Sequence, residues 1–147
     1  MSRIQAVFSQ YGILLLVNAN QVVHSGQGAF TVAGIDDLRA GNPDLEAALR
    51  GLDPHMPALL LSHRPEVFPL AAAYGIQLTL AGHYHGGQIK LSLPSGDISV
   101  VHLVTPYPEG LYRLNASHLY VSRGIGTTFT PVRISVPPEI TLLHLSM

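Results

Sequence analysis

The 147-residue chain has the length of one domain, and its 12% of charged residues is about half the fraction of an average soluble domain. With 47% hydrophobic residues and a formal net charge of −1, the composition excludes a disordered chain and argues against non-specific nucleic-acid binding, which needs clustered Lys and Arg. Because cysteine is absent, disulfides and thiolate metal sites are excluded, and any metal must have nitrogen and oxygen ligands.

The start of the chain contains neither a signal-peptide pattern nor a transmembrane pattern. Residues 1–10 have no apolar core followed by small residues, and the apolar run Ile13–Val17 is far shorter than the roughly 20 residues of a spanning helix. Taken as written, the sequence predicts a cytoplasmic protein.

Strands and helices alternate in the first part of the chain. Strands are predicted at the apolar runs Ile13–Val17, Gln21–His24, Phe30–Ile35, Ala58–Ser62 and Leu78–Ala81. One helix is predicted over Leu45–Leu52, with Asn42 as N-cap and Pro43 at the first helical position. A second helix is predicted from Pro65 to about Tyr74, where Gly75 ends it.

Beyond Gln88 the pattern changes to short β segments separated by Pro, Gly and Asn. They are predicted at Ile89–Leu93, Ile98–Val104, Gly110–Leu114, His118–Ser122 and Ile140–Leu145. The expected fold class is therefore α/β: mixed or parallel strands with two helices, followed by a mostly antiparallel β part.

Two predicted buried strands are each followed by histidine. His63 follows Ala58–Ser62, whereas His83 and His85 follow Leu78–Ala81 in the stretch Ala-Gly-His-Tyr-His-Gly-Gly-Gln. Ligands of open α/β sheets bind beyond the carboxyl ends of the strands, and imidazole suits zinc, manganese, iron or nickel. The pattern predicts a metal site with His63, His83 and His85 as ligands.

Other histidines are interpreted as ordinary polar residues, because each is isolated within a predicted β segment. These are His24, His102, His118 and His144. Asp53-Pro54-His55 has ligand-like spacing, but it precedes a strand and therefore lies at the amino end, so we interpret it as a turn.

Two motifs of this chain resemble the C-terminal motifs of calcineurin-like metallophosphoesterases. They are Ser62-His63-Arg64-Pro65 and Gly82–Gln88, which reads GHYHGGQ. The resemblance is to the bacterial branch whose signature reads GHTHGGQ, with Tyr84 at a variable position. Further segments are similar to that branch: Ala33–Asp37, Tyr120–Gly126 and Pro138–Ile140.

The resemblance implies the C-terminal half of a four-layer αββα sandwich. It also implies two divalent ions (Mn, Fe, Zn, Ni or Mg) that clamp a phosphate-ester substrate and activate water. Carried over by position, His63 and His83 ligate the second ion and His85 the first, while Gly86 and Gly87 shape the turn beside the phosphate. Members of this branch are cytoplasmic or membrane-associated.

The family's first-half motifs, DxH, GDxxD and GNHD, have no match in residues 1–147, where Gly41-Asn42-Pro43 lacks the histidine. The resemblance thus implies a single partial domain without the general-acid histidine. Imidazoles without a bridging carboxylate do not offset the repulsion between two dications, so we expect negligible activity from the chain alone. We also expect an exposed apolar face whose partner is the missing N-terminal half or a second copy of the chain.

Two other functions fit parts of the pattern. A non-catalytic binding module on a phosphoesterase-like fold would explain the absent ligands, although it leaves the retained histidines without a reason. A cupin-type barrel also uses His-x-His, but it needs a glutamate where this chain has Gln88, Ile89 and Lys90. For Arg64 and Arg123, both phosphate contact and a structural salt bridge remain open.

Overall fold

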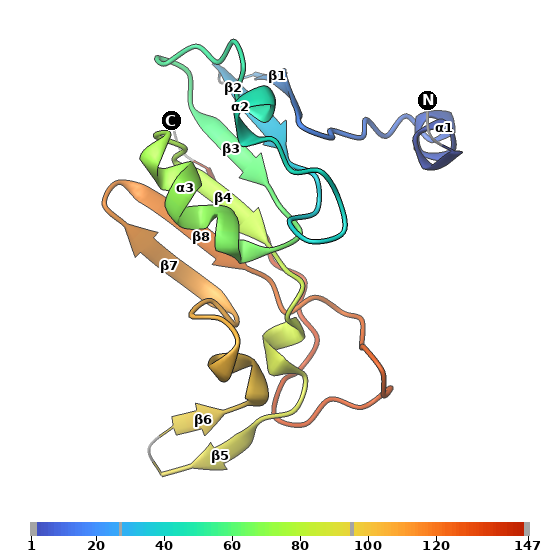
Figure 1. Ribbon diagram of the computed structural model, residues 1–147, viewed down its shortest axis with the longest axis vertical. Helices are drawn as coiled ribbons and strands as arrows, with labels where there is room; N and C mark the ends of the chain where they lie inside the picture. Colours follow the sequence, from blue (N-terminus) through green and yellow to red (C-terminus); the bar gives the residue numbers. More distant parts are fainter. Residues whose placement is uncertain (1–2, 27, 95, 146–147) are drawn as a thin grey trace.

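A mixed six-stranded sheet forms the centre of the computed structural model, which describes residues 3–26, 28–94 and 96–145 (Figure 1). The strand order is β1 (Ala19–Ser25), β2 (Gly28–Gly34), β3 (Ala58–Leu61), β4 (Leu78–Ala81), β8 (Ser117–Val121) and β7 (Gly110–Leu114). The inner pairs β2–β3, β3–β4 and β4–β8 are parallel, and the outer pairs β1–β2 and β7–β8 are antiparallel. The predicted α/β class is confirmed.

One face of the sheet is covered by helices α2 (Leu45–Ala48) and α3 (Phe68–Ala73), the latter preceded by the 3-10 turn η1 (Pro65–Val67). Alternate strand residues point to this face. A first core cluster joins Leu60 and Ile76 to α2 and α3, and a second packs Phe68 against Leu119 and Val121. Helix α1 (Arg3–Gln10) has no buried residue and lies away from the sheet (Figure 1).

The carboxyl ends of β3 and β4 lie at one edge of the sheet because these strands are parallel neighbours. His63 follows β3, and the GHYHGGQ stretch with its 3-10 turn η2 (His85–Gly87) follows β4. Beyond this edge project the hairpin of β5 (Leu91–Leu93) and β6 (Gly96–Ile98) and the 3-10 turn η3 (Val100–Leu103) (Figure 1). The fold therefore brings these segments together at one end.

The other face of the sheet is apolar and incompletely covered. Leu61, whose neighbour Leu60 points to the helices, is 41% exposed. Part of this face forms a cavity of about 620 Å³ with the C-terminal segment, lined by Phe30, Leu59, Leu78, Leu143 and Leu145 among others. The expected exposed apolar face is present.

Two predicted strands are wrong. Ile13–Leu16 and residues 140–145 have no strand structure, and Leu14 and Leu142 are 62% and 81% exposed. A strand must pair its backbone groups with a neighbour, and neither run has such a neighbour among the described residues. Both runs have the composition of strands, but neither pairs with another strand among the described residues.

Other boundaries also differ from the expectation. The first predicted helix is one turn long, and its N-cap is Asp44, whose carboxylate accepts from the Ala47 N–H at 2.8 Å, rather than Asn42. The predicted strand Ile98–Val104 is interrupted at Ser99, whose reciprocal bonds with His102 start η3 instead. The helix predicted from Pro65 is confirmed, and Gly75 follows it at φ 79°. No helix of the described residues is long and apolar enough to cross a membrane.

Candidate functional site

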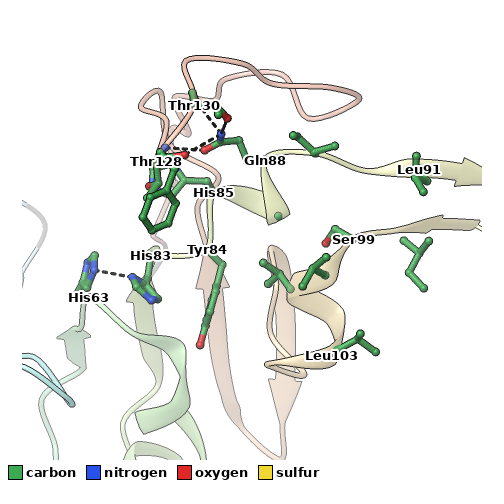
Figure 2. Close-up of a pocket in the computed structure, with 16 residues that line it drawn as sticks. His63, His83, Tyr84, His85, Gln88, Leu91, Ser99, Leu103, Thr128 and Thr130 are labelled. Carbon is green, nitrogen blue, oxygen red and sulfur yellow. Dashed lines mark hydrogen bonds between the residues drawn. The ribbon is translucent and has the colours of Figure 1, made fainter.

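His63 and His83 contact each other directly. His83 Nδ1 lies 2.9 Å from His63 Nε2, with the ring centroids 4.7 Å apart and the planes at 68° (Figure 2). The two loops are also joined through the backbone, because the Gly82 N–H donates to the His63 carbonyl at 3.2 Å. The parallel pairing of β3 and β4 therefore produces the histidine pair.

The donor set fits part of a metal site. Two nitrogen ligands at roughly 2.0–2.1 Å from one ion lie about 3 Å apart, which matches the spacing of the His63 and His83 nitrogens. Among the described residues, however, no group of three or more His, Cys, Asp or Glu side chains could hold an ion. The pair thus fits two ligand positions, and the described part of the chain does not complete the set.

Arg64 and Asp37 extend this pair. Arg64 Nη1 donates to His83 Nε2 at 2.6 Å, and Arg64 Nε lies 3.5 Å from an Asp37 carboxylate oxygen. The ion-pair alternative for Arg64 is thus observed. Sequence reasoning gave Asp37 no role; its position just after β2, at the same edge of the sheet, was the available indication.

Burial lowers the pKa of His83, and the positive charges of Arg64 and His63 lower it further, against the opposing effect of Glu66 and Asp37. A lowered pKa keeps the imidazole neutral at lower pH, and neutral imidazole is the form that ligates metals. Because Arg64 donates to Nε2, however, the neutral ring carries its proton on Nδ1 and donates it to His63 Nε2, so ligation of a metal through Nδ1 requires this proton to leave that nitrogen.

His85, in the turn after β4, lies apart from this contact and packs against the loop that follows β8. Its Nδ1 is 3.0 Å from the Gly126 carbonyl oxygen and its Nε2 is 3.3 Å from Thr128 Oγ1. Gln88 joins the same loop, because its amide accepts from the Thr128 N–H and donates to the Thr130 carbonyl (Figure 2). The structure thus brings His63 and His83 into contact and places His85 separately.

Arg133, which sequence reasoning missed, holds this loop. Its guanidinium donates to the backbone carbonyls of Gly126 at 2.6 Å, Arg123 at 2.8 Å and Gly124 at 3.1 Å. The Gly126 oxygen is also the partner of His85 Nδ1. No sequence pattern marks Arg133, since its partners are backbone atoms exposed only by the loop's conformation.

Gly86 and Gly87 are required by packing. Both have positive φ, 62° and 83°. A β-carbon on Gly86 would collide with the side chains of Arg123 and Val136, and one on Gly87 would collide with that of Ser99. Gly87 lines the same pocket as the three histidines, whereas Gly86, in the middle of the turn, is buried and does not line it.

Beneath this turn lies a network of ion pairs. Lys90, which is buried, pairs with Glu109, and Arg123 Nη2 donates to Glu139 Oε2 at 2.5 Å. Arg123 Nε is also 3.8 Å from a Glu109 oxygen. The salt-bridge alternative for Arg123 is therefore observed, and the network ties the turn to the C-terminal segment.

His63, His83 and His85 open into a cavity of about 950 Å³ that is mostly apolar (Figure 2). Polar groups of Gln88, Thr128 and Thr130 lie near His85. The opposite wall is built from the hairpin and η3: Ile89, Leu91, Ile98, Val100, Val101 and Leu103. The cavity therefore has an apolar end and an end that is polar apart from Phe129, which lies between the two threonines.

Known proteins resemble this chain over most of its length. It is 37% identical over 135 residues to the uncharacterized metallophosphoesterase YkuE of Bacillus subtilis, covering 91% of this chain and 47% of that protein. It is 31% identical to the phosphodiesterase YaeI of Escherichia coli (91% and 48%). It is 36% identical to a transmembrane protein with metallophosphoesterase domain of Bos taurus (78% and 27%).

The chain spans about half the length, or less, of these curated relatives. No family model and no solved structure matches it.

Proposed function

Since the chain belongs to the metallophosphoesterases over about 90% of its length, we propose that it supplies the histidine ligands of a binuclear centre that hydrolyses phosphate esters. The observation that carries this proposal is the contact between His63 and His83, whose nitrogens lie at the spacing of two ligands of one ion. We assign these two histidines to one divalent ion and His85 to the other.

Divalent ions bound there would stabilise the charge of the phosphoryl group and lower the pKa of water. The protein's own residues orient these ligands. The backbone hydrogen bond from Gly82 to His63 holds the loops of His63 and His83 together. Arg133 holds the loop that contacts His85. Gly86 and Gly87 would shape the turn beside the phosphate, Gly87 by leaving room for the Ser99 side chain.

The remaining ligands, carboxylates above all, would come from a part of the domain outside these residues. This follows from the ligand chemistry, because the described residues hold no group of three suitable donors. A bridging carboxylate offsets the repulsion of two dications that imidazoles alone leave unopposed.

Metal binding tests the ligand assignment. In calorimetric titrations Zn²⁺ should bind the chain weakly, because His63 and His83 supply only two ligands, and His63→Ala or His83→Ala should each remove this binding. His24→Ala, an exposed histidine on β1, is the matched control and should have no effect.

Activity tests the function itself. Joined behind the preceding half of the Bacillus relative, the chain should hydrolyse bis(p-nitrophenyl) phosphate only with metal, and His83→Ala should abolish this activity. Absence of metal binding even in the joined protein would favour a non-catalytic binding module. Robust hydrolysis by the 147 residues alone would contradict the view that ligands are missing.

A further inference from the structure

The cavity beside the histidines has a divided chemistry. Imidazoles, an amide and hydroxyls gather at one end together with the exposed ring of Phe129, and the other end is a wall of aliphatic side chains from β5, β6 and η3 (Figure 2). We define the apolar wall as Leu91, Ile98, Val100 and Leu103. A phosphate ester that is small and fully polar would contact only the first end.

The apolar wall is open to solvent. Leu91, Val100 and Leu103 are 66%, 77% and 83% exposed, and Ile98 is 42% exposed. Contiguous large apolar side chains at a surface mark a binding site, because leaving them in water costs free energy.

The apolar wall is a different surface from the uncovered face of the main sheet. That face is marked by Leu61, which is 41% exposed, and by the cavity beside Phe30 and Leu59. The wall instead stands on the hairpin that projects beyond the carboxyl edge of that sheet (Figure 1).

The wall is also held in a fixed relation to the histidines. Ser99, between β6 and η3, packs where Gly87 has no side chain, so that η3 lies against the turn containing His85. The turn continues directly into the hairpin, with the Lys90 N–H bonded to the Ile134 carbonyl at 3.0 Å. A ligand with its headgroup at the histidines therefore has its remaining atoms directed along the wall.

We propose that the substrates of this centre are amphiphilic phosphate esters, whose phosphate lies at His63, His83 and His85 and whose hydrocarbon chain lies on the apolar wall. This inference rests on the proposed function, and it adds the substrate class. The headgroup is the scissile phosphate ester, and the chain supplies binding free energy away from the reacting bond.

Binding of alkyl phosphates to the 147-residue chain tests the wall directly. Affinity should rise from butyl to octyl to dodecyl phosphate by up to about fourfold per CH₂ that becomes buried. Leu91→Ser, Val100→Ser and Leu103→Ser should each reduce this dependence on chain length, and because these side chains are exposed the variants should fold. Leu142→Ser is the matched control, 81% exposed on the C-terminal segment and outside the cavity, and it should change nothing.

The headgroup is tested with dodecyl maltoside, which should bind more weakly than dodecyl phosphate; His83→Ala should remove that preference. Equal binding of the two detergents, or tight binding to vesicles of a phosphate-free, uncharged galactolipid that the wall variants abolish, would make the wall a membrane contact and overturn the proposal. A loss of chain-length dependence in Leu142→Ser instead of the wall variants would also overturn it.

The joined protein separates this proposal from the one on which it rests. One outcome is that the joined protein hydrolyses the short ester bis(p-nitrophenyl) phosphate but shows no higher kcat/KM for long-chain phosphate esters. That result would reject the proposal of amphiphilic substrates and leave the proposed phosphoesterase function standing. No metal-dependent hydrolysis of any ester would reject the phosphoesterase, whatever the alkyl phosphates do.

Discussion

The guanidinium of Arg133 and the ring of His85 meet on one backbone atom, the carbonyl oxygen of Gly126. Arg133 Nη2 lies 2.6 Å and His85 Nδ1 lies 3.0 Å from that oxygen. A carbonyl that accepts from the imidazole Nδ1–H fixes the tautomer and leaves the lone pair on Nε2, to which the Thr128 hydroxyl donates at 3.3 Å. A carbonyl partner at the other ring nitrogen is found behind most metal-bound histidines. Arg133 therefore supports His85 both through the Gly126 carbonyl and directly, since its Nη2 lies 3.5 Å from His85 Nδ1 and its Nη1 donates to the His85 carbonyl at 3.4 Å.

Replacing Arg133 with Lys should loosen the loop. Lysine keeps the charge but lacks the planar fork that reaches the carbonyls of Arg123, Gly124 and Gly126 together. We expect the free energy of unfolding to fall by about 1–3 kcal/mol, measured by urea denaturation. Arg113→Lys is the control, because Arg113 is exposed and contacts one carbonyl. Equal effects of the two substitutions would contradict this role.

Gly86→Ala should destabilise the protein more than another glycine substitution at the same backbone angle. At Gly86 the new methyl would collide with Arg123 and Val136, whereas at Gly124, with φ 61° against 62°, it meets nothing within 4 Å. Positive φ alone costs about 1–2 kcal/mol, so Gly124→Ala should lose about that much. We expect Gly86→Ala to lose about 1–3 kcal/mol more from overpacking, measured by thermal and urea unfolding. Similar losses of unfolding free energy in the two variants would show that the side chains packed against Gly86 can move to accommodate the new methyl group.

The Glu139 carboxylate should make stability depend on acid pH. Partial burial by itself raises its pKa, but hydrogen bonds from Tyr120, Arg123 and Thr141 and the charge of Arg123 lower the pKa to about 2, from an ordinary 4.5. Because the folded pKa lies below the unfolded one, the stabilisation is complete above pH 4.5 and is lost as the pH falls through 2.

Glu139→Gln should therefore be less stable than the parent protein near neutral pH, by about 1 kcal/mol after solvent screening, and the difference should vanish toward pH 2. Urea midpoints at intervals from pH 2 to 7 measure this, with the exposed Asp97→Asn as control. A difference that stays constant with pH would contradict the assignment to the carboxylate.

Arg64→Met should raise the pKa of His83. Burial is the largest cause of the lowered value and remains in the variant, but the neighbouring positive charge of Arg64 is removed. Titration of the imidazole signals by NMR, in metal-free buffer, should show the shift, and Arg113→Met should not produce it. An unchanged or lower His83 pKa would mean that Arg64 does not act on the ring.

The uncovered sheet face should cause self-association. Leu61 points away from the helices and is 41% exposed, so it lies on the face that lacks its covering layer. Sedimentation should show concentration-dependent association that Leu61→Lys reduces. Leu70→Lys, on the outer side of α3 and 52% exposed, should not reduce it. A monomer at all concentrations would indicate that the C-terminal segment covers this face sufficiently.

The sequence was sufficient for the strands that begin the site and for the histidines that follow them. β3, β4 and β7 are continuous apolar or alternating runs bounded by turn residues, and their ends fall within a residue of the expected ones. The pairing of His63 with His83 follows from parallel neighbours, which apolar strands separated by a helix predict.

Composition alone gave the wrong structure for the runs Ile13–Val17 and Ile140–Leu145. A strand also requires a neighbouring strand with which its backbone groups can form hydrogen bonds. Arg133 could not be found at all, since its partners are carbonyls of a loop whose turns, such as Phe129 at φ 65°, carry no sequence signature. Periodicity describes regular elements, whereas this part of the site is made of irregular backbone.

The pairing of β4 with β8 has a consequence for how quickly the protein reaches its native state. These parallel neighbours are separated by the hairpin, η3 and β7, and the contact of His85 with Gly126 spans 41 residues. Closing such long loops costs chain entropy before the pairing of β4 with β8 contributes any stabilisation, so folding should be slow. We expect β2 and β3 to become ordered before β8 pairs with β4. Until β8 docks, the Arg133 loop has no support, and the histidine edge would be the last part of the molecule to become ordered.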